Sequence, residues 1–441
     1  MKLKFAKIFL CGFVFFSALA LSPARDFLAG ADFSHLKFFE DRGVVYKDNG
    51  HAEDALAILK SEGINCVRLR LFTSSAAQAQ ADPYNYINNL DYTVPLAARV
   101  KKAGLKFLLD FHYSDSWADP AKQYKPSAWT NLNFGQLVQK MREYNSNSIA
   151  AFKAANAMPD YVQVGNEITP GMLWPDGRVG GAYDNSTQWH QLRQLMNAAI
   201  EGINDAAGDT PPKIVVHIDR GGDWNTTRWF FDHLKQSPDP VPFDMIGESY
   251  YPWWHGDLDA LSNCLNNAVQ RYDKPVIVAE TAYPWTNSVQ SAYDPNLGIP
   301  LTPDGQMQFT AALASIVKSI PGGMGAGIFW WGSEYVHLPG YGLADFDKTS
   351  FFDYTGNALP VAGAMGRLAA PVALRAGISG KELSLQWPLS GAGMKLTRAT
   401  NLAPNADWTP VTNSVQNTGE QFNATLPLES APGAFYRLQA K

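Results

Sequence analysis

Two glutamates follow apolar stretches that have the composition of buried strands. Glu167 ends the stretch 161–167, directly after Asn166, and Glu280 ends the stretch 275–280. If parallel strands carry both residues to one end of a sheet, their carboxyl groups can flank a single cleft. Such a pair can hydrolyse a glycosidic bond, because one carboxylic acid protonates the leaving oxygen while the other carboxylate attacks the anomeric carbon. With the two groups about 5–5.5 Å apart, the configuration at that carbon is retained.

Further polar and aromatic residues stand at or just beyond the ends of similar stretches. They are Arg68, Arg70, His112, Trp117, Asp219, Glu248, Tyr250, Trp253, Trp285, Trp330 and Trp331. Each alone has an ordinary structural explanation, such as a salt bridge for a carboxylate or core packing for a tryptophan. Together they favour a function, because a ring of buried charge costs several kcal/mol unless it is paired.

The two glutamates need different surroundings for this chemistry. The acid must keep its proton near neutral pH, and burial and a neighbouring like charge achieve this by raising its pKa. The nucleophile must stay ionised, and an arginine at the end of the stretch 64–71 favours that. Glu248 lies two residues before Tyr250, on the same strand face, and is a rival carboxylate for either role.

Eight apolar stretches recur along the chain, most of them followed by a helical pattern. The stretches are 28–33, 64–71, 105–113, 161–167, 213–219, 243–250, 275–280 and 325–331, and helical patterns cover 51–62, 91–103, 134–155, 189–207 and 307–319. Near-continuous Val, Ile and Leu runs are typical of parallel strands that are buried on both faces. Eight such units predict an α/β fold, a (β/α)8 TIM barrel. An open doubly wound sheet is the alternative, but no GxGxxG motif follows the first stretch.

The two ends of the chain differ from this central pattern. Residues 1–24 carry Lys2, Lys4 and Lys7 before an apolar run and small residues, which predicts a secretory signal peptide. Residues 25–370 are the predicted catalytic barrel. Residues 371–441 are a predicted small all-β module of unknown role, entered through a linker at 369–380, with short strands at 382–387, 395–396, 411, 422–426 and 435–438. We therefore expect a secreted protein, extracellular or periplasmic, with no membrane attachment after signal removal.

Composition and charge exclude several classes of protein. The 441 residues are 46% hydrophobic, which excludes a disordered chain. Loss of residues 1–24 leaves 33 Lys and Arg against 41 Asp and Glu, so the formal net charge falls from −5 to −8 and gives no basic footprint for nucleic acid. Cys66 and Cys264 are expected to be buried free thiols rather than a bridge, and no Cys/His cluster has zinc spacing.

Six short motifs occur in order along residues 27–368. They are GADFS (30–34), VRLRL (67–71), LDFHYSDSWADP (109–120), QVGNEIT (163–169), GMLWP (171–175) and SYYPWWHG (249–256). This set resembles glycoside hydrolase family 53, and the third motif is specific to that family. Its members are arabinogalactan endo-β-1,4-galactanases in the large retaining barrel clan, clan A. The Asn-Glu pair and the later Glu are shared across that clan and are less specific for galactan.

The resemblance implies roles for individual residues. Glu167 matches the acid/base and Glu280 the nucleophile, while Asn166 matches the residue that bonds the sugar 2-hydroxyl. Arg68, His112, Tyr250 and Trp330 match further sugar-site residues, with Arg68 preferred to Arg70 and Trp330 to Trp331. Five further residues could form walls of additional sugar subsites or, alternatively, the core of the loops. They are Trp117, Trp174, Asp219, Trp253 and Trp285.

One feature of the family pattern is missing. Many bacterial relatives carry an acidic, glycine-rich calcium loop after the seventh strand, but residues 286–294 here have no run of carboxylates. We therefore expect that the protein requires no cofactor and has no catalytic metal. The sequence does not decide whether it binds a structural calcium ion.

The leading hypothesis is an exported, monomeric endo-hydrolase of β-1,4-galactan, the polysaccharide of type I arabinogalactan in pectin side chains. One alternative keeps the chemistry and changes the sugar to another β-1,4-glycan, namely mannan, glucan or xylan. A second alternative is a non-catalytic glycan-binding barrel. The presence of both candidate carboxylates argues against the second alternative.

Overall fold

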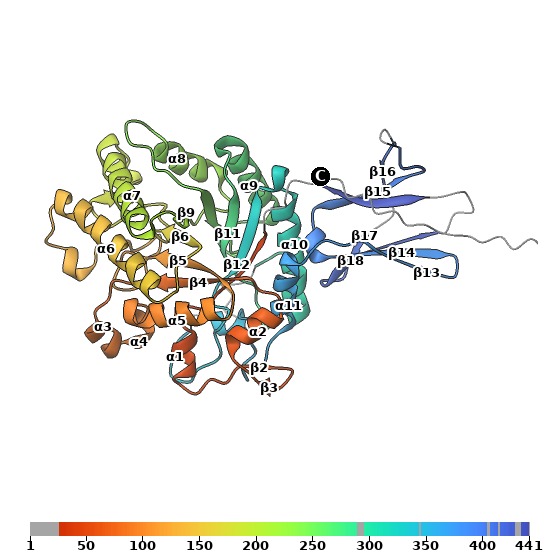
Figure 1. Ribbon diagram of the computed structural model, residues 1–441, viewed down its shortest axis with the longest axis horizontal. Coiled ribbons are helices and arrows are strands. Elements are labelled where there is room, and N and C mark those ends of the chain that lie inside the picture. Colours follow the sequence, from red (N-terminus) through yellow and green to blue (C-terminus); the bar gives the residue numbers. More distant parts are fainter. Residues whose placement is uncertain are drawn as a thin grey trace, which may run out of the picture.

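A computed structural model describes residues 26–288, 295–343, 345–403, 406–412, 415–427 and 434–440. The predicted signal peptide, residues 1–24, lies outside the described residues. Eight parallel strands form a closed barrel in the order β1-β12-β11-β10-β9-β6-β5-β4 (Figure 1). The strands are β1 (Leu28–Asp32), β4 (Cys66–Leu71), β5 (Lys106–Phe111), β6 (Tyr161–Val164), β9 (Lys213–Ile218), β10 (Met245–Ser249), β11 (Val276–Thr281) and β12 (Gly325–Trp330). All eight coincide with the predicted apolar stretches, so the prediction of a TIM barrel is confirmed.

A helix follows each barrel strand before the next one begins. These helices are α2 (Ala55–Ser61), α5 (Leu90–Lys102), α6 (Phe134–Ala154), α7 (Ser186–Ala207), α8 (Trp224–Leu234), α9 (Leu258–Tyr272), α10 (Pro303–Ser319) and α11 (Pro360–Gly366). Local signals explain where they start: Asn133 and Gln136 form a capping box at α6, and Pro303 occupies the first turn of α10. Shorter elements lie in the connections: α1 (Leu36–Glu40), α3 (Ala76–Ala81), α4 (Pro83–Tyr86) and the hairpins β2 (Lys47–Asp48) with β3 (His51–Ala52) and β7 (Gly171–Met172) with β8 (Gly177–Arg178).

Alternate residues of the barrel strands face the interior, as the pleat of a strand requires. The apolar part of the interior begins at the N-terminal ends of the strands and is a cluster of Leu28, Cys66, Leu108, Val215, Met245, Ile277, Ala279, Ala326 and Phe329. The inward residues that follow on several strands are polar and come to the C-terminal ends, where TIM barrels carry their sites. Cys66 and Cys264 are buried and unbridged, as expected.

The C-terminal residues form two small antiparallel sheets beside the barrel. One has the order β13-β14-β18-β17 and the other β16-β15-β19. Their bounds are β13 (Arg375–Ser379), β14 (Glu382–Pro388), β15 (Met394–Ala399), β16 (Thr409–Pro410), β17 (Val415–Asn417), β18 (Gln421–Pro427) and β19 (Phe435–Ala440). The predicted linker 369–380 is wrong in its second half, because β13 pairs with β14 along its whole length. Strand β17 was not predicted, since its three residues carry no apolar alternation.

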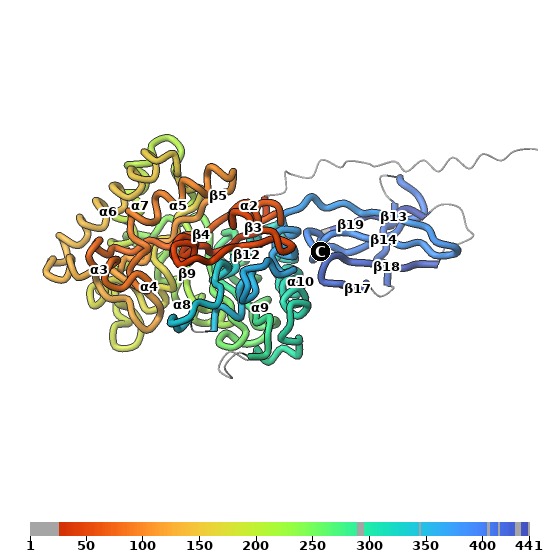
Figure 2. The backbone as a smooth tube through the Cα atoms, turned by 90° about the horizontal axis from the view of Figure 1, so that it is seen from below, coloured from red at the N-terminus to blue at the C-terminus, as the bar shows by residue number. Residues whose placement is uncertain are grey.

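These sheets adjoin the end of the barrel that is opposite to the polar residues. Leu389 and Ala392, between β14 and β15, are part of the main apolar core of the barrel. Gly393 packs so closely on Ser319, at the end of α10, that a Cβ atom would lie 2.8 Å from the Ser319 backbone nitrogen. Because α10 ends where the chain returns to the start of β12, this contact is at the N-terminal ends of the strands. Figure 2 shows the blue C-terminal strands extending beyond α10.

Candidate active site

A cleft of about 430 Å³ opens at the C-terminal ends of the barrel strands. It is lined by His112, Trp117, Ala118, Asp119, Pro120, Asn166, Glu167, Asp219, Arg220, Tyr251, Trp254, His255, Glu280, Trp331 and Phe346. The structure therefore brings six sequence-predicted site residues to one cleft: Glu167, Glu280, His112, Asn166, Asp219 and Trp117. The lining combines carboxyl groups with aromatic rings, which suits a ligand with hydroxyl groups and apolar faces.

Irregular backbone aims both glutamates into this cleft. In β11, Ser249 pairs with Glu280 while Glu248 pairs with Val278, so one extra residue stands in β11. This β-bulge turns both Ala279 and Glu280 towards the interior, and bulges of this kind re-aim side chains beside active sites. Glu167 lies just past β6 with φ of +49°, a left-handed conformation that non-glycine residues rarely adopt. Such strain is concentrated at functional sites.

Glu280 is held by one cation and one hydroxyl group. Arg68 Nη2 lies 2.8 Å from Glu280 Oε1, and Tyr251 donates its hydroxyl hydrogen to Glu280 Oε2 at 3.0 Å. Burial raises the pKa of Glu280 to about 7, against the lowering effect of Arg68. Both contacts favour the ionised form of this carboxyl group.

Glu167 has a different environment. Ser249 donates its hydroxyl hydrogen to Glu167 Oε1 at 2.6 Å. Burial, followed by the charges of Glu280 and Asp219, raises the pKa of Glu167 well above its ordinary value. Of the two carboxyl groups, Glu280 is therefore the one that ionises first, and Glu167 is the one that keeps a proton.

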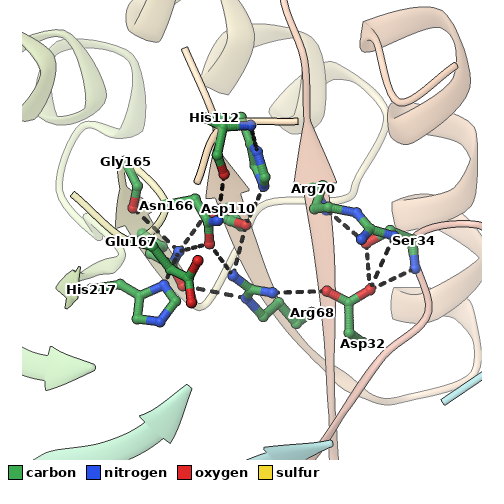
Figure 3. Close-up of polar contacts among 12 residues, drawn as sticks. Asp32, Ser34, Arg68, Arg70, Asp110, His112, Gly165, Asn166, Glu167 and His217 are labelled. Carbon is green, nitrogen blue, oxygen red and sulfur yellow. Dashed lines mark hydrogen bonds and ion pairs between the residues drawn. The ribbon is translucent and has the colours of Figure 1, made fainter. Parts of the chain in front are cut away.

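Arg68 is the centre of a buried polar network beneath the cleft (Figure 3). Its guanidinium group contacts Asp32 Oδ2 at 2.9 Å and Asp110 Oδ2 at 2.8 Å, in addition to Glu280. It also donates to Asn166 Oδ1 at 2.9 Å. A buried charge is tolerated when it is paired and hydrogen-bonded in this way. The network fixes Arg68 against Glu280 before any ligand is present.

Arg70 shares Asp32 with this network, since its Nη2 lies 3.6 Å from Asp32 Oδ1, but it has no ion pair with Glu280 among the described residues. Its guanidinium carbon lies 4.3 Å above the ring of Trp117, and Nη2 contacts His35 Nδ1 at 2.8 Å. Of the two arginines that the sequence offered, Arg68 is thus the one beside Glu280, while Arg70 supports an aromatic wall of the cleft.

His112 and Asn166 line the cleft but are already engaged by the protein. His112 Nε2 contacts Asp110 Oδ2 at 3.0 Å, and its Nδ1 accepts from the Ala118 backbone N–H at 3.0 Å. Asn166 donates to the Ala118 carbonyl oxygen at 2.9 Å. Burial lowers the pKa of His112, so its ring is neutral and orients Asp110 and the loop that carries Trp117.

Two predicted residues require a correction by one position. Tyr250 is buried outside the cleft lining and donates its hydroxyl hydrogen to the Gly256 carbonyl oxygen, whereas Tyr251 reaches Glu280. Trp330 donates from Nε1 to the Thr349 carbonyl oxygen in the core, whereas Trp331 lines the cleft. The physical reason is alternation, because neighbouring residues at a strand end point to opposite sides.

The same alternation removes Glu248 from the candidate carboxylates. Glu248 does share a strand face with Tyr250, but that face is directed to the surrounding helices. Its Oε1 accepts from the Thr227 hydroxyl at 2.9 Å, and its Oε2 accepts from the Arg220 backbone N–H at 3.1 Å. Ser249 and Tyr251 occupy the inward positions instead.

Three predicted tryptophans lie outside the cleft lining. Trp253 packs against Tyr251 with ring centroids 5.3 Å apart. Trp285 donates to the Asp347 carbonyl oxygen and Trp174 to that of Pro170. The long loops after the strands determine these positions, and their conformation has no periodic signal in the sequence.

Several residues of the cleft were not singled out by the sequence patterns. They are Trp254, His255, Arg220, Asp119, Pro120, Ala118 and Phe346. Trp254 and His255 belong to the SYYPWWHG motif, so the motif itself was the available signal. Phe346 lies far along the chain after β12, and nothing local in the sequence connects it with the cleft.

The structure gives no support for a metal centre in the part of the chain that it describes. No group of three His, Cys, Asp or Glu side chains there is arranged to hold an ion. At the start of the loop 286–294, the Ser288 carbonyl oxygen accepts from Lys348 Nζ at 2.8 Å. Residues 289–294 of the loop lie outside the described residues. Among the described helices, none is long and apolar enough to cross a membrane.

Comparison with known proteins identifies the family of this barrel. The family model of Glycosyl hydrolase family 53 matches residues 28–365. A protein of Niallia circulans, named for its place in the bgaB 5′ region, is 43% identical over 320 residues, which are 70% of this chain and 84% of that protein. The arabinogalactan endo-β-1,4-galactanase of Humicola insolens is 35% identical over 329 residues, 73% of this chain and 94% of that enzyme. The solved family 53 catalytic domain of Ignisphaera aggregans superposes with a TM-score of 0.71 and 35% identity, covering 78% of this chain and 97% of that domain. The chain belongs to glycosyl hydrolase family 53 and is a glycoside hydrolase.

Proposed function

We propose that this enzyme hydrolyses internal β-1,4-galactosidic bonds of galactan by a retaining double displacement. The carrying observation is the asymmetry of the two glutamates in one cleft. Arg68 and Tyr251 favour the ionised form of Glu280, while burial and the charge of Glu280 keep a proton on Glu167. This is the division of roles that the reaction needs.

In the first step Glu280 acts as the nucleophile and Glu167 as the acid. A Glu280 carboxylate oxygen bonds to the anomeric carbon as the bond from that carbon to the leaving oxygen breaks, and Glu167 gives its proton to the leaving oxygen. The product of this step is a galactosyl ester of Glu280 and a shortened chain with a new hydroxyl group. In the second step Glu167 takes a proton from water, whose oxygen replaces Glu280 at the anomeric carbon.

The substrate assignment is supported by the relatives and by the lining of the cleft. The Humicola insolens relative is named for its action on arabinogalactan. Trp117, Trp254 and Trp331 give the cleft apolar walls that suit sugar rings, while Asn166 and Asp219 add polar side chains that suit hydroxyl groups. Mannan, glucan or xylan as substrate is the alternative within the same chemistry. Membership of the hydrolase family argues against a non-catalytic glycan-binding barrel.

A panel of pure polysaccharides tests the substrate. We expect linear β-1,4-galactan to be cut into oligosaccharides of intermediate size early in the reaction, as an endo-acting enzyme does. Mannan, glucan and xylan serve as matched controls and should release less than about one-hundredth of the reducing ends. Cleavage of one of these with galactan untouched would replace the substrate, and binding without cleavage of any would remove the catalytic proposal.

The roles of the carboxyl groups are tested with a matched set of variants. Glu167→Gln should abolish turnover of galactan, because an amide cannot protonate the leaving oxygen. Glu248→Gln changes a buried carboxyl group outside the cleft and is the control, with turnover within about threefold of the parent enzyme once folding is verified. Full activity of Glu167→Gln with loss in Glu248→Gln would reverse the assignment.

We further propose that the enzyme is exported through residues 1–24, acts as a monomer and needs no metal. The proposed steps use only carboxyl groups and water, so excess chelator should leave turnover unchanged. Loss of turnover on chelation, restored by calcium, would contradict this point. N-terminal sequencing of the mature protein should show that residues 1–24 are absent, and light scattering should give the mass of one chain.

A further inference from the structure

A chain of hydrogen bonds runs from the barrel interior to the candidate acid/base. Gln163 Nε2 lies 2.9 Å from His217 Nδ1, His217 Nε2 lies 2.8 Å from Ser249 Oγ, and Ser249 Oγ lies 2.6 Å from Glu167 Oε1. Gln163, His217 and Ser249 are all fully buried. Figure 3 shows His217 beside Glu167 and the other end of this network at Arg68.

The direction of each hydrogen in this chain follows from its neighbours. Arg68 Nε donates to Gln163 Oε1 at 3.3 Å, which leaves the Gln163 amide nitrogen as the donor towards Asp110 Oδ1 and His217 Nδ1. His217 Nδ1 is then an acceptor, so the ring hydrogen is on Nε2 and is donated to Ser249 Oγ. Burial, followed by the charge of Arg68, lowers the pKa of His217 well below its ordinary value, so the ring carries only this one hydrogen.

The hydroxyl group of Ser249 can therefore donate its hydrogen in only one direction. Its oxygen accepts from His217, so its single hydrogen is donated to Glu167 Oε1. An oxygen that accepts a short hydrogen bond is a poor place for the proton of the carboxylic acid. That proton consequently resides on Glu167 Oε2.

We propose that Ser249, oriented by His217 and Gln163, is a positioning residue that fixes Glu167 and assigns its transferable proton to Oε2. The role rests on the proposed function of Glu167 as the acid. Ser249 itself does not touch the reacting atoms. Without it, the carboxyl group can rotate and place its proton on either oxygen, so that only part of the molecules are ready to protonate the leaving oxygen.

Other charged groups act on the same two side chains and must stay in place during the test. Those that act on Glu167 are Glu280, Asp219, Asp119 and Tyr251, and those that act on His217 are Arg68, Asp110, His112 and His255. None of them is changed when Ser249 is replaced. A shift in the pH profile of a Ser249 variant therefore reports the lost hydrogen bond.

Two substrates separate positioning of the acid from general damage. A galacto-oligosaccharide has a poor leaving group that requires the proton, whereas a dinitrophenyl β-galactobioside leaves with little protonation. For Ser249→Ala we expect kcat/KM, which reports the step in which the leaving group departs, to fall about 10- to 100-fold on the oligosaccharide and less than about threefold on the aryl glycoside. The basic limb of kcat/KM should move to higher pH, because a hydrogen bond that favours the carboxylate form of Glu167 is removed.

Matched variants make the result decisive. Ser333→Ala removes another buried hydroxyl group, one that donates to the Trp330 carbonyl oxygen, and should show no difference between the substrates. Ser249→Thr keeps the hydroxyl group and should restore the oligosaccharide rate. If Ser249→Ala fails to fold, Ser249→Cys can replace it, because it nearly keeps the side-chain volume and has a weaker hydrogen-bond donor. It should show the same difference between the two substrates, with a smaller loss on the oligosaccharide.

The positioning role is wrong if Ser249→Ala loses the same factor in rate on both substrates and the basic limb of its kcat/KM profile stays at the same pH. Failure of the proposed function is recognised separately with Glu167→Ala. If Glu167→Ala also shows no difference between the two substrates, Glu167 is not the acid. If Glu167→Ala shows the difference and Ser249→Ala does not, only the role of Ser249 is wrong.

Discussion

The lower and upper parts of the barrel interior are built from the same strands but have opposite chemistry. The lower part, towards the N-terminal ends, contains apolar side chains such as Leu108, Val215 and Ile277. The upper part contains buried polar side chains, among them Asp32, Arg68, Asp110, Gln163, His217, Ser249 and Glu280. Both parts exclude water, so burial alone does not distinguish them.

The difference teaches which part stabilises the fold and which part prepares the reaction. Each buried leucine, isoleucine, valine, methionine or phenylalanine of the lower part contributes about 1.5–3 kcal/mol by leaving water. The charged groups of the upper part lose their hydration, and the pairing of Arg68 with three carboxylates, together with hydrogen bonds such as that from Tyr251 to Glu280, offsets this cost. In return, the groups that act on a substrate are already oriented before it binds.

The largest expected effect comes from a change in the upper part that leaves the fold intact. Glu280→Gln should reduce kcat on galactan by at least about a thousandfold, because an amide does not attack the anomeric carbon. Its free energy of unfolding at neutral pH should equal or exceed that of the parent enzyme, since a buried carboxyl group is removed. Turnover assays and urea unfolding measure the two quantities, and a variant that is active or much less stable would break the division between the two parts.

The second effect is on stability and comes from the centre of the upper network. Arg68→Met should lower the free energy of unfolding by about 3–5 kcal/mol, because Asp32, Asp110 and Glu280 lose their buried cation. Urea unfolding followed by tryptophan fluorescence measures this loss. Arg142→Met is the control, since its ion pairs with Glu201 and Asp205 are exposed, and it should change stability little. An equally stable Arg68→Met variant would show that the pairing does not hold the upper part together.

Most of the fold could be predicted because its signals are local. Many of the barrel strands are near-continuous apolar stretches, and Gly63 and Gly104 end the helical patterns before the second and third of the eight strands. Glu167 and Glu280 were predictable because they stand directly at strand ends within recognisable motifs. The helices α8 and α9 were not named in advance, although their apolar spacing was available.

The exact set of cleft residues was less predictable, for a physical reason. The register of a strand decides which of two neighbouring residues turns inward, and an apolar stretch alone does not show that register. Phe329 and Ser249 face the interior, so alternation brings Trp331 and Tyr251 to the cleft instead of Trp330 and Tyr250. The bulge in β11 turns Glu280 inward after Ala279, which already faces inward, against simple alternation. Trp253 and Trp285 depend on long loops whose conformation is determined by distant contacts, as with Trp285 and Asp347.

The third expected effect is a dependence of the free energy of unfolding on pH. The pKa of Glu280 is raised from 4.5 to about 7, so between these values the folded enzyme holds a proton that the unfolded chain releases. This contribution to stability is complete below about pH 4.5 and is lost as the pH rises through about 7. The advantage of Glu280→Gln over the parent enzyme in free energy of unfolding should therefore grow across this range. Parallel stability curves of the two proteins from pH 4.5 to 8 would contradict the raised pKa.

The smallest effect comes from the lower part. Ile277→Val removes one buried methyl group and should lower the free energy of unfolding by about 1 kcal/mol, with kcat unchanged. Its stability curve against pH should run parallel to that of the parent enzyme, because no titrating group is altered. A large loss of kcat in this variant would mean that the two parts of the interior are coupled, against the comparison above.

Trapping of the covalent intermediate tests the central assignment most directly. A fluorinated β-galactobioside with a dinitrophenyl leaving group forms the ester rapidly and releases it slowly, and the labelled peptide can be identified by mass spectrometry. We predict a single galactobiosyl label on Glu280, and none in the Glu280→Gln variant. A label on Glu167 or Glu248, or the absence of any label while the leaving group is released with inversion, would contradict the account.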